Sequence, residues 1–132
     1  MTAPSAKAGG YVLVIDDDAI LRDLVADWLE TAGYRVRKAA DCQSAVNALD
    51  AGAPALIVSD MFMPGRCGGA AIAELKRYAP NAPLIAVSGY FKSGSGVSVD
   101  EALAAGASRA LAKPVRRAQL LIAVSELIGP AN

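Results

Sequence analysis

Four apolar stretches of this chain are each followed by a polar side chain suited to handling phosphate or a metal ion. Two are followed by carboxylates, one by a hydroxyl and one by an ammonium group. In a parallel sheet the carboxyl ends of the strands meet at one edge, where open α/β folds place their ligand crevice. Such groups at one edge indicate a site for a divalent cation and a phosphoryl group. The stretches and the residues that follow them are 11–15 with Asp16, Asp17 and Asp18, 55–59 with Asp60, 83–87 with Ser88, and 107–112 with Lys113.

Helix patterns separate these apolar runs, so strands and helices alternate, which predicts βαβ units and a parallel sheet. The run 11–15 is apolar throughout, as expected for a strand buried on both faces. Asp18 and Asp41 each precede a helical pattern and are predicted to cap it, and Gly33 is predicted to end the first helix. The predicted strands are 11–15, 34–38, 55–59, 83–87 and 107–112, and the three later helices span about 69–78, 99–105 and 115–128.

Three segments lack a regular pattern. The start, 1–9, is small and polar and is predicted to be a flexible arm before a single domain over 10–129. The segment 61–69 is rich in helix and strand breakers and is predicted to be a loop. The segment 89–96 contains several glycines and serines and is predicted to be long and flexible.

Composition narrows the classes of function. The 132 residues are 54% hydrophobic and 20% charged, enough for one domain with a full core and no second domain for output. The net charge is +0, so we expect no direct contact with nucleic acid. No apolar stretch is long enough to span a bilayer, so no membrane insertion is expected.

Histidine is absent from the chain, and only two cysteines are present, Cys42 and Cys67. This excludes Ser-His and Cys-His catalysis and a histidine metal site. The cysteines form no metal-binding pattern and are interpreted as free thiols of a cytoplasmic protein. If phosphate reaches this chain from a phosphohistidine, that histidine belongs to another molecule.

Taken together, these motifs resemble the receiver domains of two-component response regulators. The resemblance covers nearly everything from Tyr11 to Ile128 and implies a flavodoxin-like (βα)5 fold, a doubly wound parallel sheet of strand order 2-1-3-4-5. The matching motifs are Val14-Ile15-Asp16-Asp17-Asp18, Asp60-Met61-Phe62-Met63-Pro64-Gly65, Ser88-Gly89, and Ala105-Gly106-Ala107 leading to Lys113-Pro114.

The resemblance implies that Asp60 accepts a phosphoryl group from a sensor histidine kinase or a phosphotransfer protein. It implies that Asp17 and Asp60 bind Mg²⁺ or Mn²⁺ directly with the backbone carbonyl of Phe62, and that Asp16 acts largely through water. The resemblance further implies that Lys113, the Ser88 hydroxyl and Gly89 bind the phosphoryl group, and that Lys113-Pro114 is a cis peptide.

The sequence departs from the usual receiver pattern in its switch. The aromatic residue that is usual three positions before the lysine is replaced by Ala110, and Val115 stands where an aromatic is frequent. The common coupling between a moving ring and the phosphoryl group therefore cannot operate in its usual form. Tyr90, directly after Ser88-Gly89, is the alternative aromatic toggle.

Other functions on the same fold remain open. One is a phosphorylation-independent interaction module, and another is a receiver excised from a hybrid kinase or multidomain regulator. A phosphatase with an aspartate nucleophile needs a general acid close behind it, but Asp60 is followed by Met61 and Phe62. A flavin-binding protein needs a phosphate-cradling loop where this chain has three acids. A signalling phosphoacceptor rather than an enzyme is favoured, with output through an unidentified target protein, a homodimer or onward phosphotransfer.

Overall fold

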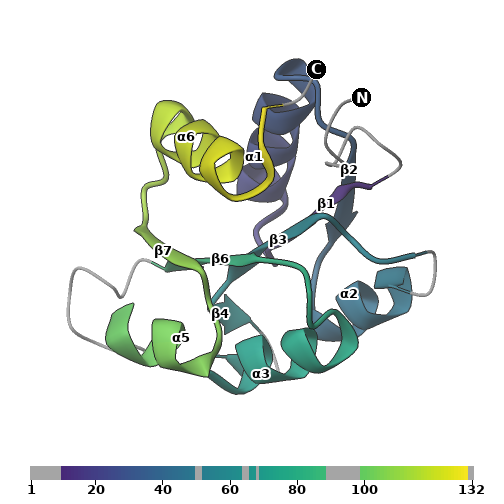
Figure 1. Cartoon of the computed structure of the whole chain (residues 1–132), viewed down its shortest axis with the longest axis vertical. Coiled ribbons are helices and arrows are strands. Elements are labelled where there is room, and N and C mark those ends of the chain that lie inside the picture. The colour runs from purple at the N-terminus through teal and green to yellow at the C-terminus, as the bar shows by residue number, and fades with distance from the viewer. Residues whose placement is uncertain (1–9, 50–51, 64–65, 68, 89–98, 131–132) are drawn as a thin grey trace.

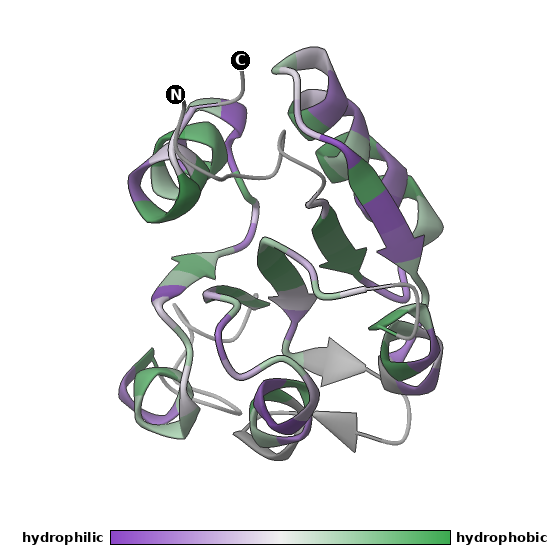
Figure 2. Ribbon diagram, turned by 45° about the vertical axis from the view of Figure 1, so that its right-hand side comes forward, coloured by the Kyte–Doolittle hydropathy of each residue, from purple (hydrophilic) through white to green (hydrophobic). Residues whose placement is uncertain are grey.

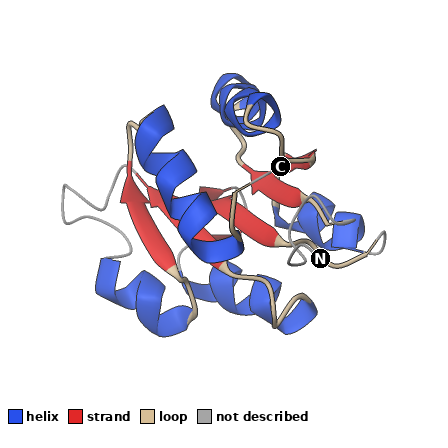
Figure 3. Ribbon diagram, turned by 45° about the horizontal axis from the view of Figure 1, so that its top comes forward, coloured by secondary structure: helices blue, strands red, loops and turns tan. Residues whose placement is uncertain are grey.

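A computed structural model describes residues 10–49, 52–63, 66–67, 69–88 and 99–130 of the chain. A single five-stranded parallel sheet lies between two layers of helices, as Figures 1 and 3 show. In chain order its strands are β1 (Val12–Ile15), β2 (Val36–Ala39), β3 (Leu56–Asp60), β6 (Leu84–Ser88) and β7 (Arg109–Ala112). Their spatial order is β2-β1-β3-β6-β7, which confirms the predicted order 2-1-3-4-5.

The helices divide between the two faces of the sheet. α1 (Ala19–Thr31) and α6 (Arg117–Ile128) cover one face, and α2 (Cys42–Ala48), α3 (Gly69–Tyr78) and α5 (Val99–Ala105) cover the other (Figure 1). None of the helices described is long and apolar enough to cross a membrane.

Each face of the sheet has its own hydrophobic core, because successive side chains of a strand point to opposite faces. In β1, Val12 and Val14 pack with the core under α1 and α6, whereas Leu13 and Ile15 pack with the core under α2, α3 and α5. This explains the uninterrupted apolar runs of the sequence. Figure 2 shows the central strands in green, while edge strand β2 is largely purple.

The predicted helix signals are confirmed. Asp18 Oδ1 accepts hydrogen bonds from the Ile20 and Leu21 amides at 3.0 and 3.1 Å, and the Asp41 carboxylate accepts one from the Ser44 amide at 2.7 Å. That amide, followed by the Ser44 hydroxyl, holds the pKa of Asp41 below its ordinary value. The stabilisation is therefore present at neutral pH and is lost as the pH falls through this lowered pKa.

Two element predictions need correction. The predicted loop 61–69 contains a short antiparallel pair, β4 (Phe62–Met63) with β5 (Arg66–Cys67), and two residues per strand are too few for an alternating pattern to show in the sequence. The last helix begins at Arg117 rather than 115, because Arg116 is extended, with φ −100° and ψ 140°. The other strand bounds shift by one or two residues, as helix and strand ends commonly do. The predicted flexible segments 1–9 and 89–96 lie outside the described residues.

Two glycines with nearly equal positive φ angles offer a test of packing at the end of α5. Gly106 has φ +124° and Gly52 has φ +123°. A Cβ atom at Gly106 would lie 3.3 Å from Lys76 Cγ, whereas one at Gly52 would meet nothing within 4 Å. Lys76 has little freedom to move away, because its Nζ donates to the Ala82 carbonyl at 2.7 Å.

We expect Gly52→Ala to lower the free energy of unfolding by about 1–2 kcal/mol through backbone strain alone. Gly106→Ala should cost about 1 kcal/mol more, because the added methyl group also crowds Lys76. Urea unfolding followed by circular dichroism measures both. Equal losses in the two variants would show that the crowding at Gly106 has no energetic effect.

Candidate functional site

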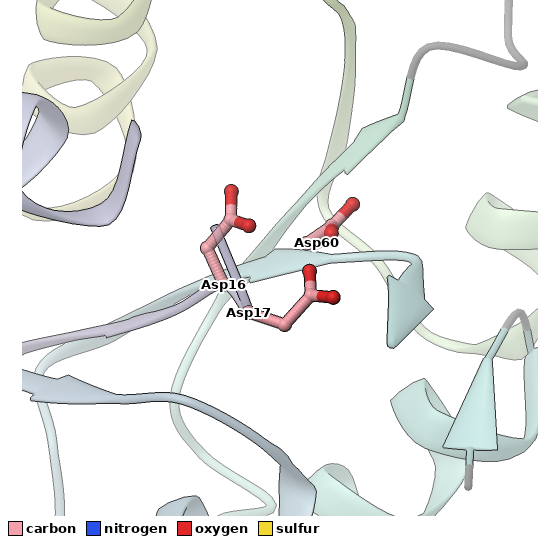
Figure 4. Close-up of side chains that lie close together, drawn as sticks. All are labelled: Asp16, Asp17 and Asp60. Carbon is pink, nitrogen blue, oxygen red and sulfur yellow. The ribbon is translucent and has the colours of Figure 1, made fainter. Parts of the chain in front are cut away.

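Three carboxylates meet at the carboxyl ends of β1 and β3, which are neighbours in the sheet. Ile15 is paired in register with Ser59, so Asp16 and Asp60 each stand one residue further along adjacent strands. Carboxylate oxygens of Asp16, Asp17 and Asp60 lie within 4.8 Å of one another. Figure 4 shows the three side chains gathered at this point. The predicted juxtaposition of the acids is confirmed.

The surroundings of the three acids differ. Asp60 is 5% exposed and Asp16 is 8% exposed, whereas Asp17 is open to solvent. Asp16 Oδ1 accepts a hydrogen bond from the Asp18 amide at 2.9 Å, and Arg22 Nη1 donates to the Asp16 carbonyl at 2.9 Å. Asp16 is thus held by the start of α1, while Asp17 faces outward.

Lys113 brings a positive charge to the two buried acids from the end of β7. Its Nζ lies 3.4 Å from Asp60 Oδ1 and 3.5 Å from Asp16 Oδ2. One ammonium group thus faces both buried carboxylates, and Asp17 adds a third negative charge nearby. With the Arg22 guanidinium also beside Asp16, three acids and two bases leave one negative charge unneutralised within a small, partly buried volume.

This donor set fits a hard divalent cation. Mg²⁺ is bound through a few carboxylate oxygens and keeps several water molecules, which the exposed side of Asp17 permits. When bound, such a cation would neutralise charge among the acids and on a phosphoryl group beside them. Phe62 begins β4 two residues after Asp60, and the role predicted for its backbone carbonyl stays a prediction.

The other predicted site residues have varied positions. Ser88 is 2% exposed and ends β6, the strand beside β3, and its carbonyl accepts a hydrogen bond from the Lys113 amide at 3.0 Å. Ala110 is paired in register with Ala86, so a small residue does occupy that position of β7. The Lys113–Pro114 peptide is cis, the form that the resemblance implies. Gly89 and Tyr90 lie outside the described residues.

Comparison with known proteins decides the family. The sequence model of the family described as response regulator receiver domain matches residues 12–125 of this chain. This chain belongs to the response regulator receiver domain family. It is 32% identical over 120 residues to the chemotaxis protein CheY of Thermotoga maritima, covering 90% of this chain and 98% of that protein. It is also 37% identical to a protein-glutamate methylesterase/protein-glutamine glutaminase of Azospirillum brasilense, but spans only 29% of that protein's length.

Solved receiver structures show the same fold. The chemotaxis protein CheY4 of Vibrio cholerae superposes with a TM-score of 0.78 at 26% identity, covering 90% of this chain and 98% of that one. A response regulator from Burkholderia pseudomallei, solved with a phosphorylated aspartic acid, a calcium ion and citrate, has a TM-score of 0.76 at 29% identity. That comparison covers 87% of this chain and 66% of the other.

Arg22 is a site residue that the sequence reasoning missed. It belongs to α1, and its hydrogen bond to the Asp16 carbonyl ties this helix to the acid-bearing loop. No motif singles it out, because a lysine or arginine on the first turns of an exposed helix is common. Only its three-dimensional position shows the connection.

Two lysines form ion pairs that differ in both burial and distance. Comparing them shows which of the two properties decides how much an ion pair contributes to stability. Lys113 faces Asp16 and Asp60 at 3.4–3.5 Å and is 24% exposed, whereas Lys38 contacts Asp23 at 3.0 Å with both side chains about half exposed. The shorter pair should matter less, since solvent screens an exposed pair.

We expect Lys113→Met, without divalent metal, to lower the free energy of unfolding by about 1–3 kcal/mol, because two buried carboxylates lose their counter-charge. The control Lys38→Met should cost about 0.5 kcal/mol or less. Chemical unfolding in chelator-treated buffer measures both. A larger loss for Lys38→Met would contradict the assignment of Lys113 as the main counter-charge of the site.

Proposed function

We propose that this receiver domain accepts a phosphoryl group on Asp60 from a phosphohistidine of a sensor histidine kinase or phosphotransfer protein. The observation that carries this proposal is the cluster of Asp16, Asp17 and Asp60 with Lys113 at 3.4 Å from Asp60. The family consists generally of signalling modules rather than enzymes, so modification of Asp60 would act by changing the binding of a downstream target protein.

Asp60 is the best acceptor of the three acids. Asp16 is held to the start of α1 through Oδ1, which accepts from the Asp18 amide. Lys113 lies slightly nearer to Asp60 than to Asp16, at 3.4 against 3.5 Å. Asp17 lies on the exposed side of the cluster. Asp60 ends β3, the central strand of the five-stranded sheet, and is 5% exposed. The phosphorylated aspartic acid of the related Burkholderia structure supports the same chemistry.

The proposed transfer requires little covalent help from the protein. A carboxylate oxygen of Asp60 forms a bond to phosphorus as the phosphorus–nitrogen bond of the donor's phosphohistidine breaks. The donor imidazole leaves with the electron pair, and Asp60 becomes an acyl phosphate. Attack of water on phosphorus later releases inorganic phosphate and regenerates the carboxylate. Phosphoryl transfer depends mainly on positioning and charge neutralisation, which Lys113 supplies at 3.4 Å.

Mg²⁺, or Mn²⁺ in its place, is the proposed cofactor, with Asp17 and Asp60 as direct ligands and Asp16 acting through water. The Phe62 carbonyl completes the proposed protein ligands. The open side at Asp17 suits an ion that keeps several waters, so weak binding is expected.

In the proposed switch, the first change is the negative charge added at Asp60. A phosphoryl group adds about −1.5 to −2 charges and strong hydrogen-bond acceptors beside Lys113 and Ser88. Ser88 and Gly89 would bind it from the end of β6, and Tyr90 would then reorient in place of the aromatic residue that Ala110 lacks. The shift would alter the surface of α5, β7 and α6, where we place the target or a second copy.

The acceptor assignment is tested by labelling with acetyl phosphate and Mg²⁺. We expect wild-type protein to gain one phosphoryl group by intact-mass spectrometry and Asp60→Asn to gain none, because the amide is not a nucleophile of comparable strength. Ser59→Ala, at the preceding buried position, is the control and should label like the wild type. Normal labelling of Asp60→Asn would overturn the assignment. A wild-type protein that never labels but still binds a target would favour the phosphorylation-independent interaction module.

The role of Asp17 as a metal ligand is tested by replacing Asp17 or its neighbour Asp18 with asparagine, which removes one negative charge in each case. We expect Mg²⁺ to raise the unfolding temperature of the wild type, since a ligand at a hundred times its Kd adds about 2.7 kcal/mol of stability. Asp17→Asn should lose this increment and the Mg²⁺-dependent labelling. Asp18→Asn should keep both, because Asp18 caps α1 and asparagine caps equally well. Equal loss in both variants would indicate a general charge effect rather than a ligand at Asp17.

A further inference from the structure

An apolar cavity of about 420 Å³ lies on the α1 and α6 side of the sheet, beside the acidic cluster. Its floor is formed by Val14, Val58 and Val87, all members of the core beneath α1 and α6. Trp28 of α1 and Leu120 of α6 also line it. Its charged lining residues are Asp16, Asp60, Arg22 and Lys113.

The connection into α6 forms part of the cavity lining. The helix begins at Arg117, so Pro114 and Val115 belong to the segment between β7 and α6, and both line the cavity. Val115 is a small side chain for this task. Across the cavity Leu24 also lines it and stays 41% exposed, so the apolar side of α1 is not fully covered.

Size and polarity restrict what could occupy this space. A volume of about 420 Å³ is within the range of small-molecule sites, roughly 300–1,000 Å³. Water would find hydrogen-bond partners only at the charged end, and a cavity with an apolar body favours an apolar occupant. The indole of Trp28 offers a ring face or edge for an aromatic contact.

A charged occupant of the apolar body of the cavity would find no counter-charge there, because the charged lining residues lie together at the end beside the acidic cluster. The lining contains two acids and two bases: Lys113 faces both carboxylates, and Arg22 donates to the backbone carbonyl of Asp16. An anion would meet the two carboxylates and a cation would meet the two bases. An uncharged molecule avoids both costs.

We propose that the cavity is a binding site for a small uncharged aromatic molecule of about two fused rings. Because Asp16, Asp60 and Lys113 also line the cavity, a bound molecule would change how readily Asp60 is phosphorylated. Phosphorylation would in turn change the affinity of the cavity for that molecule. This second step rests on the proposed function, whereas binding itself does not.

The binding test uses three probes with one ring system and different charge. They are 1-fluoronaphthalene and its carboxylate and aminomethyl derivatives, followed by fluorine NMR. The neutral probe should bind saturably, and both charged probes should bind roughly tenfold or more weakly. The chain has one tryptophan, so the indole N–H resonance of Trp28 reports contact without ambiguity and should shift with the same saturation curve.

Variants locate the site. Val115→Phe should fill part of the cavity and weaken the neutral probe by about tenfold. The control Val99→Phe places the same ring at a 38% exposed position of α5, on the other face of the sheet, and should bind like the wild type. Leu24→Phe adds bulk at the partly exposed edge and should also weaken binding, which keeps the test decisive if Val115→Phe folds poorly. No saturable binding by the wild type, stronger binding of a charged probe, or equal loss in Val99→Phe would overturn the proposal.

The coupling test measures the initial rate of labelling by acetyl phosphate with Mg²⁺ at saturating neutral probe. The rate should change by about twofold or more in the wild type and in Val99→Phe, but not in Val115→Phe. Probe binding without any change in rate would overturn the coupling. A wild type that does not label at all would contradict the proposed function, and the binding measurements would still decide whether the cavity is a site.

Discussion

Like-charge repulsion at the carboxyl end of β1 and β3 is the constraint around which this receiver domain is built. Carboxylate oxygens of Asp16, Asp17 and Asp60 approach within 4.8 Å, and Lys113 pairs with Asp16 and Asp60. Such an arrangement does not stabilise the fold by itself, so the sheet must hold it in place. Two covered faces and two separate hydrophobic cores supply that support. The remaining negative charge of the carboxylates would also favour the binding of a divalent cation.

Three successive acids have three different surroundings within one short loop. Asp16 is buried and bonded to the Asp18 amide, Asp17 faces solvent, and Asp18 caps α1 through two backbone amides. The helix cap therefore orients the site, since it fixes the loop that carries the other two acids. Arg22 adds a second connection from α1 to the Asp16 carbonyl. The start of α1 and the acidic cluster are thus connected by hydrogen bonds that each involve a backbone group, one of them from the long side chain of Arg22.

The parallel sheet and the gathering of the acids with Lys113 at one edge were predictable from the residues, because apolar runs buried on both faces and helix caps leave clear patterns. The strand order followed from the resemblance to receiver domains. The β4–β5 pair was missed, since two residues per strand give no periodicity. The start of α6 was placed two residues early because Val115 and Arg116 look like ordinary first-turn residues. The cavity depends on how two helices far apart in sequence approach each other, and no local pattern encodes that distance.

Ala110 and Val115 place small side chains on either side of Lys113, at two positions where receivers often carry aromatic rings. In β7, Ala110 is paired with Ala86, so little side-chain volume is available there to transmit movement across the strand. On the other side, Val115 leaves space against Trp28 and Leu120 instead of filling it. A moving ring therefore cannot report the state of Lys113 through either neighbour. Lys113 is still connected to its surroundings by the backbone from β7 to α6 and by the hydrogen bond of its amide to the Ser88 carbonyl of β6. The same two substitutions thus remove the usual route of coupling and leave room for a different one.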